Sequence, residues 1–179
     1  MRYMRNENAE TAGKQLQSLF VSILMSMIFC FEAPAVESGD VLRLFYWQAP
    51  SIFNPHLNAA GKDREACRIT YEPLASAQAD GTLIPVLAAE IPSLENGSLS
   101  QDGRWVIWKL KSGIRWSDGH PFTSGDVLFT WEYIRNPDNN ATTIGVYDSI
   151  QRIELLDTFT IKIIFKAPNP AWALPFIGA

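Results

Sequence analysis

Segment 113–134, GIRWSDGHPFTSGDVLFTWEYI, restricts the fold most strongly, because it places a glycine turn directly before a capped helix. Asp and Ser side chains bond nearby backbone amides and glycine accepts a positive φ, so Ser117-Asp118-Gly119 predicts a turn. Thr123 and Asp126 have the spacing of a capping-box variant, which predicts a helix that ends before Asn136-Pro137. The segment therefore indicates a fold that mixes strands and helices.

The same segment contains the residue types of a Ser-His-Asp hydrolase, namely Ser117, Asp118, His120, Ser124 and Asp126. A catalytic triad needs three side chains that converge in space, whereas neighbours in a tight turn point apart. The chain also contains no G-x-S-x-G nucleophile elbow. We interpret the cluster as structural and predict no catalytic residues and no enzyme, with a secreted hydrolase as the alternative.

The net charge and the spacing of motifs argue against nucleic-acid binding, a metal site and a nucleotide cofactor. The formal net charge is -4, from 15 Lys and Arg against 19 Asp and Glu, whereas nucleic-acid-binding proteins carry a basic face. His56 and His120 belong to no spaced set of ligands, so we predict no metal site. Neither a P-loop nor a dinucleotide-binding glycine pattern is present, so we predict no cofactor.

The N-terminus has the pattern of a secretory signal peptide. Basic residues precede the apolar run 19–31, and Ala33-Pro34-Ala35 follows it, which predicts a signal peptide over 1–35 and a periplasmic protein. The run is shorter than the roughly 20 residues of a spanning helix. The alternatives are an uncleaved membrane anchor, a lipid on Cys30, or an extracellular location.

The remaining chain, 36–179, has the pattern of one α+β region without internal repeats. We expect strands at 41–47, 104–111, 150–155 and 160–165, with the last two in a hairpin, a helix at 63–71, and turns at 78–81, 96–97 and 102–103. Pro85 excludes a central strand over 83–88. Cys67 has no second cysteine in this region, so we predict a small buried apolar residue without a disulfide.

A series of short motifs extends from residue 41 to the end of the chain. Its members are Asn54-Pro55-His56, Tyr71-Glu72-Pro73-Leu74, Asp80-Gly81 with Pro85 and Leu87-Ala88, Trp108-Lys109-Leu110-Lys111, Trp116-Ser117-Asp118-Gly119, Pro121-Phe122-Thr123 with Asp126-Val127, and Ala167-Pro168-Asn169-Pro170-Ala171-Trp172. Each motif is weak alone, but their order and spacing are specific. The series resembles the N-terminal part of the family 5 extracellular solute-binding proteins, the oligopeptide-, dipeptide- and nickel-binding components of ABC importers.

The resemblance implies a fold and a function. The fold class is α+β or α/β: a two-lobed, type II periplasmic-binding-protein-like fold of the extended-size class, with 36–179 as its N-terminal lobe portion and the second lobe absent. The implied function is to bind a short peptide in the interlobe cleft and deliver it to a membrane permease and ATPase complex, as a monomer. A recognition module not coupled to transport is an alternative. Because much of the family's ligand contact comes from the absent part, we expect this chain to bind its ligand weakly or not at all.

The resemblance also implies residues that line the ligand cleft. They are Trp47 and Gln48, where the first strand ends, the loop residues Asn58, Ala59, Ala60, Gly61 and Lys62, and Tyr147. Aromatic anchors with a few polar groups are typical of ligand clefts. The structural alternatives are a core position for Trp47, a solvated charge for Lys62 and a packing role for Tyr147.

Overall fold

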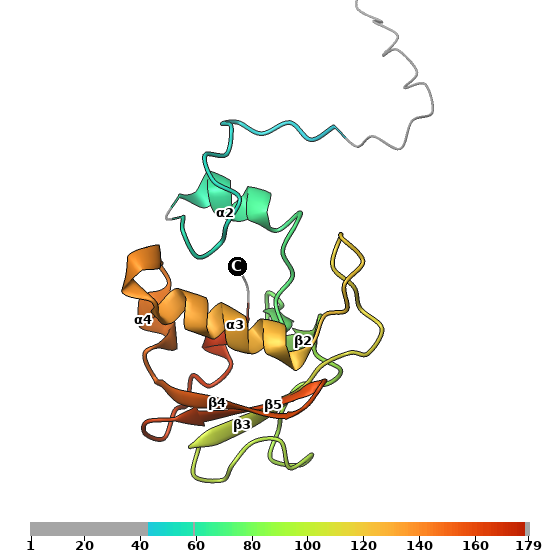
Figure 1. Ribbon diagram of the computed structural model, residues 1–179, viewed down its shortest axis with the longest axis vertical. Helices are drawn as coiled ribbons and strands as arrows, with labels where there is room; N and C mark the ends of the chain where they lie inside the picture. The colour runs from blue at the N-terminus through green and yellow to red at the C-terminus, as the bar shows by residue number, and fades with distance from the viewer. Residues whose placement is uncertain (1–42, 59, 178–179) are drawn as a thin grey trace, which may run out of the picture. The chain divides into compact units, whose positions relative to one another are not determined.

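The computed structural model describes residues 43–58 and 60–177 (Figure 1). The predicted signal peptide and Ala59 lie outside the described residues. Of the two units into which the chain divides, the second, Tyr46–Ala179, is compact and contains all of the described helices and strands. Among the described residues, none of the helices combines the length and the hydrophobicity that crossing a bilayer requires.

An antiparallel sheet of three strands forms the base of the second unit. Its order is β3 (Trp105–Lys109), β5 (Thr160–Phe165), β4 (Ile150–Asp157). The inward residues alternate as a half-buried sheet requires, and Trp108 pairs with Ile161 while Val106 pairs with Ile163. All four side chains are fully buried. The predicted strand at 104–111 and the hairpin over 150–165 are therefore confirmed.

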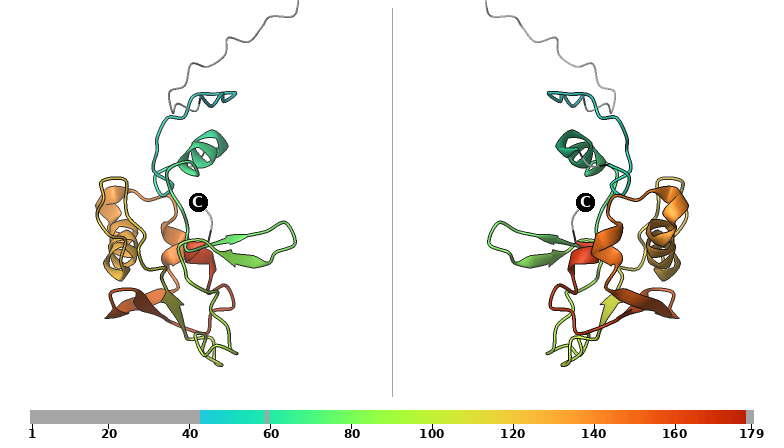
Figure 2. Two further views of the ribbon diagram at one scale, coloured as in Figure 1. Left: turned by 90° about the vertical axis from the view of Figure 1, so that its right-hand side faces the viewer. Right: turned by 90° about the vertical axis from the view of Figure 1, so that its left-hand side faces the viewer.

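Helix α3 (Ser124–Arg135) lies along one face of this sheet (Figure 2). Its Val127, Trp131 and Ile134 are buried in the same hydrophobic cluster as the strand residues. The predicted capping box is confirmed: the Asp126 carboxylate accepts hydrogen bonds from the Thr123 amide at 2.7 Å and the Thr123 hydroxyl at 3.0 Å. The Asp126 carboxylate thereby pairs the Thr123 amide, one of the amides that lack a partner within the helix.

The predicted glycine turn before α3 is also confirmed. Gly119 has φ 90°, which favours glycine. The His120 amide donates to the Asp118 carboxylate at 2.9 Å, and the Trp116 amide donates to the His120 carbonyl at 2.8 Å. The Asp118 side chain therefore stabilises the backbone of the turn.

Shorter elements complete the unit. They are helices α2 (Gly61–Cys67) and α4 (Ile144–Tyr147), the 3-10 turns η1 (Pro137–Asn139) and η2 (Leu174–Phe176), and the two-stranded hairpin of β1 (Ala75–Ala77) and β2 (Leu83–Pro85). Pro85 ends β2 at the edge of this small hairpin, in agreement with its exclusion from a central strand. The predicted turns at 78–81, 96–97 and 102–103 are present.

Of the two elements predicted in the first part of the chain, the strand is wrong and the helix has other bounds. Residues 43–47 form no strand, and Phe45 and Trp47 are 96% and 77% exposed. A strand needs a neighbouring backbone to complete its hydrogen bonds, and none of the described strands pairs with this segment. The predicted helix at 63–71 is present as α2, but it spans Gly61–Cys67. Its Asp63 carboxylate accepts a hydrogen bond from the Ser51 amide at 2.6 Å.

The capping box gives a stability prediction. Thr123→Ala removes the N-cap hydroxyl, and we expect it to lower the free energy of unfolding by about 1 kcal/mol, measured by urea denaturation. Glu132→Ala is the control, because Glu132 is exposed on the same helix. An equal loss in both variants would contradict a specific role for the cap.

Candidate functional site

A buried ion pair holds the loop around Ser51 against helix α2. The Lys62 ammonium lies 2.8 Å from the Asp63 carboxylate, and it also donates to the Ser51 hydroxyl. Both charged side chains are almost fully buried. Two hydrogen bonds hold the pKa of Asp63 below its ordinary value. The bond from Lys62 has the larger effect, and the bond from the Ser51 amide has the next largest.

Asn58 joins the same loop to the core of α2. Its side-chain amide donates to the Asn54 carbonyl at 2.9 Å and to the Cys67 sulfur at 3.6 Å. Cys67 is a free thiol with no exposed surface, and burial raises its pKa. The prediction that Cys67 is a small buried residue is therefore confirmed.

Hydrogen bonds also join this loop to the segment before α4. The Thr142 amide donates to the His56 carbonyl at 2.8 Å, and the Thr142 hydroxyl donates to the Asn58 carbonyl at 2.8 Å. The His56 Nδ1 lies 3.0 Å from the Thr143 hydroxyl. The tertiary fold thus brings residues 54–58 next to residues 142–147, which are more than 80 positions away in the sequence.

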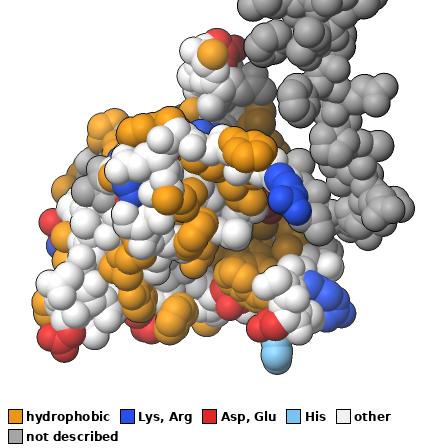
Figure 3. All heavy atoms as spheres, turned by 90° about the horizontal axis from the view of Figure 1, so that it is seen from above, with side chains coloured by type: hydrophobic (Ala, Val, Ile, Leu, Met, Phe, Trp, Pro, Cys, Tyr) orange, Lys and Arg blue, Asp and Glu red, His pale blue; other side chains and the backbone are white. Residues whose placement is uncertain are grey.

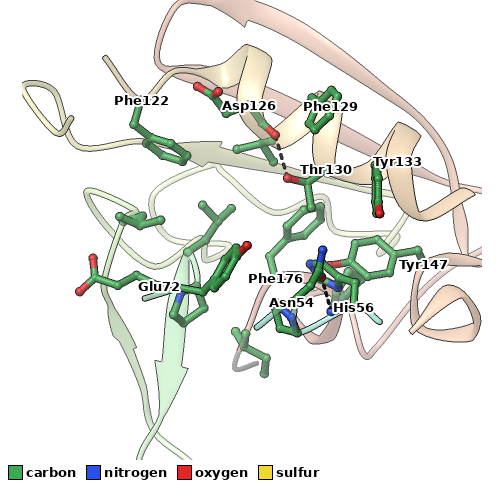
Figure 4. Close-up of a pocket in the computed structure, with 18 of the residues that line it drawn as sticks. Asn54, His56, Glu72, Phe122, Asp126, Phe129, Thr130, Tyr133, Tyr147 and Phe176 are labelled. Carbon is green, nitrogen blue, oxygen red and sulfur yellow. Dashed lines mark hydrogen bonds between the residues drawn. The ribbon is translucent and has the colours of Figure 1, made fainter. Parts of the chain in front are cut away.

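A pocket of about 410 Å³ opens beside this junction (Figure 4). This volume lies within the range of about 300 to 1,000 Å³ that is typical of small-molecule sites. Aromatic side chains form much of the lining: Tyr71, Trp116, Phe122, Phe129, Tyr133, Tyr147 and Phe176. The polar residues of the lining include Asn54, His56, Glu72, Asp126 and Thr130.

The aromatic residues of the pocket are arranged in contact with one another. The Tyr147 ring packs edge-on against the rings of Phe176 and His56, with distances between ring centroids of 5.6 Å and 6.0 Å. Phe129 is 65% exposed, and hydrophobic side chains are exposed over much of the face shown in Figure 3. The lining therefore offers an apolar surface with polar groups at a few positions, as ligand pockets do.

The titratable groups at one side of the pocket are neutral near pH 7. Burial lowers the pKa of His56 and raises the pKa of Tyr147, because it disfavours the charged form of each side chain. The described lining contains no Lys or Arg. The pocket can therefore form hydrogen bonds at this side without presenting a positive charge.

The cleft residues expected from the resemblance lie in three places. Tyr147 lines the pocket. Four of the expected residues follow the pocket residues 54–56 in the chain but do not line the pocket: Asn58, Ala60, Gly61 and Lys62. Asn58 is bonded to Thr142, and Lys62 is buried rather than solvated. Trp47 and Gln48 are exposed and not part of the lining, and Ala59 lies outside the described residues.

The pocket also contains residues that the sequence analysis did not propose as site residues. Asn54, His56 and Tyr71 line it, although they belong to the motifs on which the resemblance rests. Phe129 and Tyr133 come from α3, where helical patterning alone does not separate a pocket residue from a core residue. The motifs could therefore have indicated Asn54, His56 and Tyr71 as site residues. No sequence pattern distinguished Phe129 and Tyr133 from core residues.

The side chains that resembled a hydrolase cluster do not converge. The Ser124 hydroxyl donates to the Asp157 carbonyl at 2.7 Å, Asp126 caps α3, and His120 lies on the surface beside Asp118. Within residues 43–58 and 60–177, no three His, Cys, Asp or Glu side chains gather as a metal site would require.

Comparisons with known proteins identify related sequences and folds. Residues 82–179 match the bacterial extracellular solute-binding proteins, family 5 middle. The glutathione-binding protein GsiB of Pectobacterium atrosepticum is 30% identical over 102 residues, which are 57% of this chain and 19% of that protein.

Two solved structures share the fold. The structure of NikZ from Campylobacter jejuni in complex with Ni(L-His) has a TM-score of 0.59 and 25% identity, covering 71% of this chain and 24% of that one. Haemophilus influenzae OppA in complex with the peptide RPPGFSPFR has a TM-score of 0.61 and 20% identity, covering 69% and 26%. The chain thus spans about a quarter of the length of these structures, as part of a two-lobed periplasmic-binding-protein fold.

The buried ion pair predicts a pH dependence of stability. Because the pKa of Asp63 is lowered below 3.8 in the folded protein, its stabilising effect is complete above that pH and is lost as the pH falls through the lower, folded value. We expect the melting temperature of Asp63→Asn to lie below that of the wild type at neutral pH. The difference should begin to shrink below about pH 4, where the carboxyl of the unfolded chain takes up a proton, and should vanish only below the lower pKa of the folded protein.

Thermal melts between neutral and acidic pH measure this difference. Glu65→Gln is the control, since Glu65 is exposed on the same helix, and its difference from the wild type should stay small throughout. A difference for Asp63→Asn that remains constant down to the lowest pH would refute the role assigned to the ion pair.

Proposed function

This chain belongs to the bacterial extracellular solute-binding proteins of family 5, and we propose that it is part of the substrate-binding component of an ABC importer. In this function the protein binds a solute in a cleft and presents it to a membrane permease, and no bond of the solute is broken. Residues 36–179 then form the N-terminal part of the solute-binding domain. The permease and its ATPase are the partners.

One observation carries the proposal, namely the aromatic pocket beside the junction of residues 54–58 and 142–147. A solute receptor needs a site that excludes water from an apolar ligand group while satisfying its polar groups. The pocket combines both kinds of lining, and it contains Tyr147, which the resemblance had indicated independently.

We propose a short peptide as the ligand. GsiB, the relative that is 30% identical, is named for binding glutathione, which is a peptide. An extended peptide offers backbone amides for hydrogen bonds and side chains for apolar pockets, so a receptor can hold many sequences in the same manner. The ligand would close the two lobes of the complete receptor only if the closed form binds it more tightly than the open form.

Export to the periplasm belongs to the same proposal. A receptor of an importer has to meet its solute outside the cytoplasmic membrane, and residues 1–35 have the pattern of a cleavable signal peptide. The protein is proposed to act there as a monomer.

The ligand class can be tested by thermal stability. A mixture of di- to pentapeptides should raise the melting temperature of the full chain, because a ligand that binds only the folded state stabilises it by mass action. At a hundred times the Kd the gain is about 2.7 kcal/mol. Peptide concentrations from micromolar to millimolar cover the affinities to be tested.

The control is a second set of candidate solutes, namely oligosaccharides and nickel–histidine complexes. A rise with either of these and none with peptides would reject the peptide assignment while retaining the receptor. The absence of a rise with all three would reject solute binding by this chain.

The export step gives a separate prediction. When the full chain is produced in a Gram-negative host, the periplasmic protein should begin at Val36, as determined by N-terminal sequencing. Ala35→Leu should leave the precursor uncleaved, because the cleavage site requires small residues. A mature protein that retains the apolar run, or one with a lipid on Cys30, would contradict the prediction.

A further inference from the structure

One side of the pocket carries polar side chains with atoms that no described residue bonds. Asn54, His56 and Tyr147 lie together there, on the side away from Glu72 and Phe122 (Figure 4). The Asn54 side-chain oxygen accepts from the His56 amide at 2.9 Å, whereas no described residue bonds its side-chain nitrogen. His56 uses Nδ1 toward Thr143, and none of the described residues bonds its Nε2.

Tyr147 is the most constrained member of this group. The residue is only 4% exposed, and its ring packs against His56 and Phe176. No described residue forms a hydrogen bond with its hydroxyl. Within the described part of the chain, two side-chain polar atoms are fully enclosed without a hydrogen-bond partner, the indole nitrogens of Trp108 and Trp131. The Tyr147 hydroxyl is not one of them. Tyr147 lines the pocket, and its side chain lies there beside Asn54 and His56 (Figure 4).

The charges around the pocket disfavour an anion. Glu72 and Asp126 contribute the carboxylates of the lining, and no Lys or Arg of the described residues accompanies them. A ligand carboxylate in this pocket would lose hydration and meet like charges without a cation. An uncharged polar group has neither cost, provided that its hydrogen bonds are made.

We propose that the Tyr147 hydroxyl selects an uncharged amide of the ligand, while the aromatic lining takes an adjoining aromatic side chain. The pocket then accepts an internal aromatic residue of a peptide in preference to a residue that ends in a free carboxylate. This inference rests on the proposed function and adds to it the chemical group that is recognised.

The chemistry of the two partners is complementary. A tyrosine hydroxyl can donate to an amide carbonyl or accept from an amide N–H, and an aromatic ligand side chain gains edge-on contacts with rings such as Phe129 and Tyr133. Because the Tyr147 hydroxyl is already held in place by the packing of its ring, little side-chain freedom is lost on binding. A site of this kind discriminates against ligands that leave its polar group unpaired.

Three small probes test the proposal on the full chain: N-acetyl-L-phenylalanine amide, N-acetyl-L-phenylalanine with a free carboxylate, and N-acetyl-L-alanine amide. Ligand-detected NMR titrations give the Kd of each. The phenylalanine amide should bind most tightly. Tyr147→Phe should weaken its binding by about five- to tenfold, the range expected for one hydrogen bond, and Tyr46→Phe, outside the pocket, should not change it.

Each outcome decides between the alternatives. Since the Tyr147 hydroxyl has no partner among the described residues, Tyr147→Phe should keep the wild-type melting temperature, so weaker binding can be assigned to the lost hydroxyl. Equal affinity of Tyr147→Phe and the wild type, or equal binding of the amide and carboxylate probes, overturns the inference. If free peptides raise the melting temperature but no probe binds, this inference fails and the proposed function stands.

Discussion

The start of helix α3 is fixed on the turn between β4 and β5, and the arrangement of the core and of the pocket depends on this contact. The Ser124 amide donates to the Thr158 carbonyl at 2.8 Å, and the Ser124 hydroxyl donates to the Asp157 carbonyl at 2.7 Å. Since a helix is rigid over its length, anchoring its first turn determines where Phe129 and Tyr133 lie. One helix therefore provides buried residues to the core and aromatic residues to the pocket.

A second set of contacts positions the opposite side of the pocket. The loop at residues 54–58 has few regular backbone hydrogen bonds of its own, and side chains replace them: Asn58 bonds to Asn54, and Thr142 bonds to the loop carbonyls. The buried pair of Lys62 and Asp63 secures the neighbouring helix. Buried polar groups are retained at low cost only when their partners are present, so these contacts specify one arrangement of the loop.

Local patterns in the sequence predicted much of the fold but only part of the candidate site. The hairpin over 150–165, the strand at 104–111 and the cap at Thr123 follow from alternation, turn residues and spacing, which act over a few residues. The strand at 41–47 failed because a strand also depends on a partner, which its own residues do not specify. Tyr147 was indicated through the resemblance, whereas the pocket residues of α3 were not, because their helical pattern is also that of a core.

The sequence by itself determined the secondary structure around the glycine turn and the family to which the chain belongs, since both depend on the identity and order of neighbouring residues. Only the tertiary structure decided that His56 and Tyr147 share a pocket wall and that Lys62 is buried in an ion pair rather than solvated. The physical reason is that pocket walls and buried pairs form between segments distant in the chain. Their free energy depends on burial and geometry that no local pattern contains.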